Sequence, residues 1–198
     1  EYGLLRPLIQ RLLHWPACEA KVVVTGMHLS AEFGMTYREI EQDGIPIDRK
    51  IEILLSSDSA AAMSKSMGLA LISFADYFAE TKPDALIVLG DRFETLAVCC
   101  AAMNQRIPIL HLHGGETTEG AIDEAVRHAI TKMSYLHFTS TELYRKRVIQ
   151  LGEQPERVFN VGALGVENIK NMQLLERKEL EQELAIHLPE RYAVVTYH

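Results

Sequence analysis

Carboxylates and basic side chains follow two apolar runs of the chain. Asp91 and Arg92 come directly after Leu89-Gly90, and the segment 113–116, His-Gly-Gly-Glu, comes directly after Leu112. Carboxylates that share one site raise one another's pKa, so that one stays protonated as an acid while another acts as a base. Asp91, Glu116 and His113 are therefore candidates for acid and base chemistry.

A helical segment adds further charged groups. Glu124, Arg127, His128 and Thr131 recur close to one face of a helix that starts near Ile122. Asp123 and Arg127 are four residues apart, which is the spacing of an ion pair on a helix. Another loop, after Thr25, offers His28. An acid-rich cleft with a few basic side chains is expected.

Each motif also has a purely structural interpretation. Asp91 after a strand is also typical of a helix N-cap, and Gly114-Gly115 is typical of a turn. The charges from Glu124 to His128 also fit a solvated helix face. Spacing alone leaves these alternatives open.

Strands that alternate with helices are expected to position these groups. Apolar runs predict strands at 21–25, 85–89, 107–112, 136–139 and 158–161. Helical periodicity predicts helices over 4–13, 63–78 after a cap at Asp58 or Ser59, 93–103, 122–134 and 143–151. Apolar strands separated by helices indicate a parallel α/β sheet covered on both faces, whose ligands bind at the carboxyl ends of the strands.

The pattern changes after Val166. A charged helix over 167–183 and a strand over 192–196 predict a linker and the first strand of a second domain. The predicted organisation is therefore a Rossmann-like domain over 1–166 and the start of another over 167–198.

Composition and motifs argue against several classes of protein and binding site. The formal charge of −7 disfavours nucleic acid as a partner, and no run is long enough for a membrane helix. The three cysteines lack metal-ligand spacing. The absence of Gly-x-Gly-x-x-Gly and P-loop motifs argues against dinucleotide or P-loop sites. A cytoplasmic protein without a structural metal is expected.

Taken together, the motifs resemble the hydrolysing UDP-N-acetylglucosamine 2-epimerases. The match runs in order through the segments 1–8, 25–29, 33–34, 40–43, 89–92, 111–116, 122–124, 127–134 and 161–168. The resemblance implies a GT-B architecture, in which two Rossmann-like domains bind the nucleotide sugar between them. It also implies a homo-oligomer, a dimer or tetramer, and no metal or redox cofactor.

The resemblance further implies a reaction and roles for residues. The C2 proton of UDP-N-acetylglucosamine is removed and UDP is expelled; water then adds to the 2-acetamidoglucal to give N-acetylmannosamine. Asp91, Glu116 and an acid of the pair Asp123-Glu124 carry this work, with Glu124 favoured because it shares a face with Arg127. His113 orients Glu116 or serves the elimination. The substrate-binding residues are Glu1, His28, Arg92, Arg127 and His198.

The sequence departs from the family pattern, and alternative functions stay open. The family's first strand, ahead of Glu1, and the second domain after His198 are missing, so the chain is expected to be a fragment that does not turn over by itself. One alternative is the same chemistry on a UDP-2,4-diacetamido-trideoxy sugar. The others are a GT-B protein that binds a UDP-sugar without epimerising it, and a purely structural fragment. The segment 113–116 favours the hydrolysing over the non-hydrolysing branch.

Overall fold

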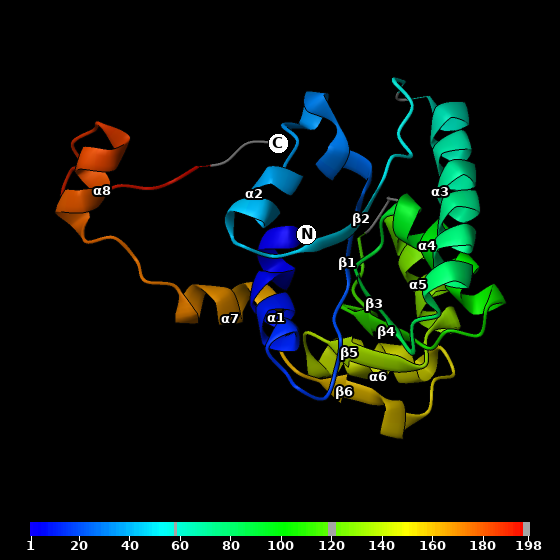
Figure 1. The fold of residues 1–198 in the computed structure, drawn as a ribbon. Helices are drawn as coiled ribbons and strands as arrows, with labels where there is room; N and C mark the ends of the chain where they lie inside the picture. The colour runs from blue at the N-terminus through cyan, green and yellow to red at the C-terminus, as the bar shows by residue number, and fades with distance from the viewer. Residues whose placement is uncertain (58, 119–121, 196–198) are drawn as a thin grey trace.

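All strand pairs in the described part of the chain are parallel, as the sequence predicted. A computed structural model describes residues 1–57, 59–118 and 122–195 (Figure 1). One sheet pairs β1 (Val22–Thr25) with β2 (Ile47–Ile51), and the other has the order β3-β4-β5-β6. The strands of the second sheet are β3 (Leu86–Leu89), β4 (Ile109–Leu112), β5 (Leu136–Thr139) and β6 (Val158–Asn160).

Helices connect the strands and cover the sheets. In chain order they are α1 (Tyr2–Leu13), α2 (Tyr37–Gln42), α3 (Ala60–Thr81), α4 (Phe93–Asn104), α5 (Asp123–Met133), α6 (Glu142–Gln150), α7 (Leu164–Asn171) and α8 (Arg177–Leu184). Short 3-10 helices lie at Gly26–Leu29 (η1), Ala31–Phe33 (η2) and Pro155–Arg157 (η3). Helix α4 packs between α3 and α5 on one side of the sheets (Figure 1).

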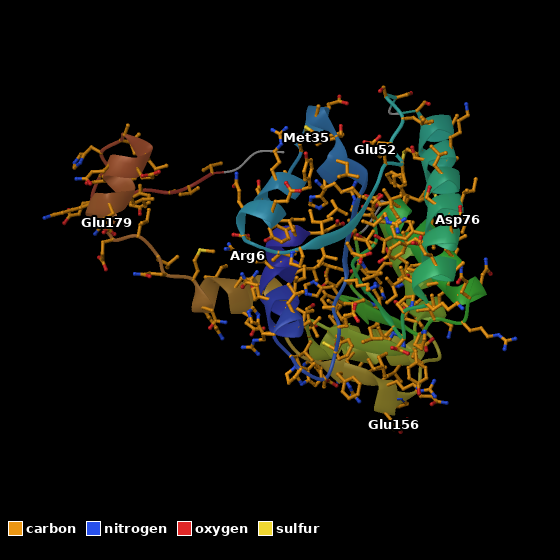
Figure 2. All side chains as sticks on the ribbon, in the orientation of Figure 1. Arg6, Met35, Glu52, Asp76, Glu156 and Glu179 are labelled. Carbon is orange, nitrogen blue, oxygen red and sulfur yellow. The ribbon has the colours of Figure 1, made fainter. Side chains whose placement is uncertain are left out.

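Two apolar clusters hold these layers together. The larger one packs Phe74 and Phe78 of α3 against the strands and α4, and it extends to Ile109 and Ile130. The smaller one joins α1, β1 and α2 through Tyr2, Val24 and Ile40. Figure 2 shows side chains filling the space between the sheets and the helices. Burial of the apolar faces of the helices and strands, rather than local helix propensity, holds the elements in place and so sets where the strand ends lie.

Local signals for α3 agree with the structure. The Ser59 hydroxyl accepts a hydrogen bond from the backbone N–H of Ala62, which caps the helix start. The helix ends at Lys82, which has a left-handed backbone and precedes Pro83. Asp58, the other predicted cap, lies outside the described residues.

Two predictions for the last part of the chain are wrong. The predicted helix over 167–183 is two helices, because α7 begins earlier, at Leu164, and α8 starts anew at a capping box between Glu176 and Glu179. Helix α7 packs on α1, whereas α8 buries no residue and stands apart from the rest of the chain (Figure 1). Residues 192–195 of the predicted strand form none: Val194 and Val195 are 81% and 86% exposed and have no strand to pair with among the described residues.

The sequence did not predict β2 or α2. Residues 48–50 of β2 are charged, so the strand lacks an apolar run, and its pairing with β1 stabilises it instead. Because β1 and β2 pair only with each other among the described residues, the parallel strands are divided between two sheets. The expectation of a strand ahead of Glu1, and of a domain boundary at 166, stays a prediction.

Candidate functional site

The turn after β3 places Asp91 at the carboxyl end of the larger sheet. Gly90 has a φ of 76°, and its N–H donates to the carbonyl of Leu112 on β4. Such a backbone favours glycine, because a Cβ crowds the following carbonyl in this region. The turn therefore directs Asp91 beside the loop that follows β4.

Asp91 forms an ion pair with Arg127 of α5. The two side chains are only 19% and 9% exposed, so the pair is largely removed from water. Burial raises the pKa of Asp91; the Arg127 charge opposes this shift, and the charges of Asp123 and Glu116 add to it. Asp91 thus pairs with one guanidinium and also feels the charges of two further carboxylates, and we call Asp91, Glu116, Asp123, Arg127 and His113 the acid cluster.

Glu116 lies at the end of a strained turn. His113 and Gly115 have φ of 63° and 79°, and a Cβ on Gly115 would lie 2.5 Å from the carbonyl oxygen of Tyr144. The second glycine of the segment is therefore required by close backbone packing as well as by conformation. This packing seats the turn directly against α6.

Two side chains hold the Glu116 carboxylate. The Ser140 hydroxyl donates to Oε1 at 2.6 Å, and Nδ1 of His113 lies 3.4 Å from the same oxygen. The backbone N–H of Leu164 donates to His113 Nε2, so the neutral ring carries its proton on Nδ1, facing Glu116. The ring is thus placed where it can orient Glu116, and the orienting role of His113 stays a prediction.

Asp123 and Glu124 have different surroundings. Oε1 of Glu124 lies 3.6 Å from Nε2 of His128, one turn further along α5. Asp123 instead acts on the pKa of Asp91. The sequence favoured Glu124 because it shares a helix face with Arg127; Glu124 faces His128 instead, and which of the two acids is catalytic stays a prediction.

A second group of charges surrounds Arg92, the N-cap residue of α4. Its Nε atom lies 2.6 Å from Oε1 of Glu94 and 3.6 Å from Oε1 of Glu1. Gly26 has a φ of 62°, and a Cβ added to it would lie only 3.1 Å from the same Glu94 oxygen, so glycine lets the chain pass close to Glu94. His28 belongs to this group because the Arg92 and Glu94 charges act on it, although burial is the main cause of its lowered pKa. We call Arg92, Glu1, Glu94 and His28 the Arg92 cluster.

The structure thus gathers most of the predicted site residues into two adjacent clusters, linked by the neighbours Asp91 and Arg92. Glu124 stands in a separate pair with His128, and His198 lies outside the described residues. Sequence reasoning missed Ser140 and Glu94. Ser140 comes directly after β5, so the rule that ligands bind at strand ends would have found it. Glu94 resembled an ordinary acid in the first turn of a helix.

Within the ranges that the structure describes, no three His, Cys, Asp or Glu side chains are grouped so that they could hold a metal ion. Among the same residues, no helix combines the length and apolarity that spanning a membrane requires.

Comparison with known proteins identifies relatives along the whole chain. The model of a family described as UDP-N-acetylglucosamine 2-epimerase matches residues 10–198. The chain is 46% identical over its full length to the GDP/UDP-N,N'-diacetylbacillosamine 2-epimerase (hydrolyzing) of Campylobacter jejuni, of which it covers 51%. It is also 46% identical to the polysialic acid biosynthesis protein P7 of Escherichia coli, again over its full length and 50% of that protein. A UDP-N,N'-diacetylbacillosamine 2-epimerase (hydrolyzing) of Legionella pneumophila is 38% identical, matched over 100% of this chain and 52% of its own length.

A solved structure shows the same fold. The UDP-GlcNAc 2-epimerase of Neisseria meningitidis bound to UDP-GlcNAc matches 92% of this chain with a TM-score of 0.75 and 23% identity. The chain covers 50% of that structure, and it spans about half the length of the curated relatives that it matches.

Proposed function

Because the chain belongs to the UDP-N-acetylglucosamine 2-epimerase family, we propose that it supplies the acid cluster of a hydrolysing 2-epimerase acting on a UDP-2,4-diacetamido-trideoxyhexose. The Campylobacter and Legionella relatives, at 46% and 38% identity, carry names of this activity. They favour the alternative raised from the sequence over its first expectation, UDP-N-acetylglucosamine. The family's architecture implies that a second domain completes the site.

The observation that carries the proposal is the acid cluster itself. A proton at C2 of the sugar is only weakly acidic, since no carbonyl is attached there, so its removal needs a positioned base and stabilisation of the leaving group. Asp91 pairs here with Arg127 beside the carboxyl end of β3, and the charges of Asp123 and Glu116 act on Asp91. A protein that only binds a UDP-sugar has no need for such an arrangement.

The geometry supports different roles for two of the acids. Ser140 donates a hydrogen bond to Glu116, and Nδ1 of His113 lies 3.4 Å from the same oxygen; a carboxylate held in this way is suited to be the base that takes the C2 proton. As the C1–O bond breaks, a C1–C2 double bond forms and UDP leaves. Asp91, whose pKa is raised, is suited to return a proton to C2 from the opposite face. Water then adds its hydroxyl to C1 and gives its remaining proton to Asp91, while Glu116 releases the proton taken from C2 to solvent.

The remaining site residues are proposed as substrate contacts. Arg127 is engaged by Asp91, which supports a carboxylate-fixing role over a phosphate contact. Arg92, with Glu1 and His28 beside it, is proposed to contact the nucleotide sugar, and His198 is proposed to do so from the second domain.

UDP-N-acetylglucosamine is the second candidate substrate. The 46% identical Escherichia coli relative is named for polysialic acid biosynthesis, and N-acetylmannosamine chemistry belongs to sialic-acid-type synthesis. Relatives at the same identity thus point to two related sugars.

Proton NMR in deuterated water tests both candidates in protein extended to the full length of the relatives. The expected result is a free 2,4-diacetamido sugar that carries deuterium at C2, with a higher kcat/KM than for UDP-N-acetylglucosamine. Asp91→Asn should abolish the reaction, and Asp76→Asn, an exposed acid of α3, should not. A product that retains UDP would contradict the hydrolysing mechanism, and binding without turnover would favour the non-epimerising alternative.

We also propose a homo-oligomer in the cytoplasm. Light scattering on the full-length protein tests the first part and cell fractionation the second. A monomer across micromolar concentrations would contradict the proposal.

A further inference from the structure

A buried histidine lies beneath the acid cluster and takes no part in the chemistry described above. His111 is in the middle of β4, and its side chain is 0% exposed. Its Nε2 atom lies 2.8 Å from the carbonyl oxygen of Gly90, the residue before Asp91. A carbonyl oxygen only accepts, so Nε2 must carry the ring proton. His111 therefore donates to the turn that presents Asp91.

The other ring nitrogen faces α5. With the proton on Nε2, Nδ1 is an acceptor, and the Thr131 hydroxyl lies 3.2 Å from it. Thr131 is one helical turn after Arg127, and its hydroxyl is also 3.0 Å from the Arg127 carbonyl oxygen. The hydroxyl has one proton for these two acceptors, so it donates to one of them at a time, and the ring contacts the segments that carry both partners of the Asp91–Arg127 pair.

The turn toward Glu116 packs on the same ring. A Cβ on Gly114 would lie 3.1 Å from His111 Nδ1 and 3.2 Å from the Thr131 hydroxyl. A Cβ there would be tighter than ordinary packing unless its neighbours shifted, so glycine favours this close approach. Three segments of the site therefore meet at His111.

The ring is uncharged at neutral pH. Burial is the main cause that lowers the pKa of His111, to about 4, and the charge of Arg127 also contributes. A neutral ring keeps the Nε2–H donor for the Gly90 carbonyl and leaves Nδ1 as an acceptor beside Thr131.

We propose that His111 is a positioning residue for the reaction, which holds the turn of Asp91, the helix of Arg127 and the turn of Glu116 in one arrangement. This inference rests on the proposed function, because only an active enzyme reveals the effect on turnover. Its structural part, the Nε2–H form of the ring, is measurable without any activity.

Substitutions at position 111 test the positioning role in the full-length protein. His111→Phe fills the volume but leaves the Gly90 carbonyl without its donor, and a small displacement of reacting groups lowers kcat by about 10- to 100-fold. KM should change less than threefold, since the ring touches no substrate. His111→Gln restores an N–H donor toward Gly90 and should recover most of the lost kcat.

His137 supplies the matched control. It pairs in register with His111 on the neighbouring strand β5 and is equally buried, but its Nε2 faces Glu153, 3.3 Å away, rather than the site. His137→Phe should lower the melting temperature without lowering kcat. Equal losses of kcat in the two Phe variants, or a loss that glutamine does not rescue, would overturn the proposal.

Two further measurements keep the proposal testable. Nitrogen-15 NMR of the ring should show the proton on Nε2, and a proton on Nδ1 would overturn the proposal even if the enzyme is active. If His111→Phe does not fold, Thr131→Val removes one contact at little change in volume and should lower kcat at constant KM; an unchanged kcat would overturn the link to α5. A wild-type protein with the Nε2 proton but no turnover would instead refute the proposed function.

Discussion

Removing Arg127 should destabilise the protein through the charge that it leaves behind on Asp91. The two side chains are 9% and 19% exposed, so Arg127→Met leaves a carboxylate largely out of reach of water. Loss of one partner of such a pair costs about 3 kcal/mol. Because Arg127 lowers the pKa of Asp91, the substitution raises that pKa further, and the carboxylate takes up a proton at a higher pH. The cost should therefore shrink as the pH falls from 7 toward 5.

A double variant separates this charge effect from lost packing. Asp91→Asn with Arg127→Met contains neither charge, and we expect it to be about 2 kcal/mol more stable than Arg127→Met alone at pH 7. Urea denaturation of the full-length protein measures these differences. Arg49→Met is the control, because its ion pair with Glu80, at 3.1 Å, is exposed and contributes less than about 1 kcal/mol. Equal stabilities of the single and double variants at pH 7 would refute the reasoning.

Three further outcomes follow from the same geometry. As pH falls from 6.5 toward 4, the unfolded chain protonates His111 while the folded protein keeps it neutral, so this ring alone costs about 3 kcal/mol of stability. In urea denaturation, the free energy of unfolding of His111→Phe should therefore depend less on pH than that of the wild type. Equal pH dependence of the two proteins would contradict the neutral state of the buried ring. Gly115→Ala should lower the free energy of unfolding by about 3 kcal/mol, since a left-handed alanine is strained and its Cβ meets the Tyr144 carbonyl at 2.5 Å. Gly162→Ala, at a φ of 86° with nothing within 4 Å, should cost only about 1 kcal/mol in the same measurement, and similar losses would exclude the close contact as the cause. Ser140→Ala should lower kcat roughly tenfold with little change in KM, because Glu116 loses its 2.6 Å donor; a wild-type kcat in the NMR assay would show that the hydroxyl is dispensable.

Strong local patterns predicted most of the elements correctly. The apolar runs ahead of Gly90 and His113 are β3 and β4, and the Ser59 cap begins α3. The failures occur where pairing overrides local pattern. Residues 47–51 form a strand despite a charged centre because β1 lies beside them, and 192–195 remain unpaired despite their β-branched residues.

The predicted site residues were mostly brought together, and their partners were not foreseen. Asp91, Glu116 and His113 lie where the strand-end rule placed them. Neither Ser140 nor His111 has a neighbour in sequence that indicates its contact, since the carboxylate and the turn that they hold are 24 and 21 residues away.

The sequence by itself determined which residues stand at the ends of strands, because alternating apolar and polar segments decide where strands stop. The tertiary structure decided which of them meet. The register of β3 with β4 brings the Gly90 turn beside the loop after Leu112, and the rotation of α5 turns Arg127 toward Asp91, 36 residues away. The same rotation brings the charge of Asp123 to the cluster and leaves Glu124 beside His128. Such contacts depend on how distant apolar faces pack against one another, and no local spacing encodes that packing.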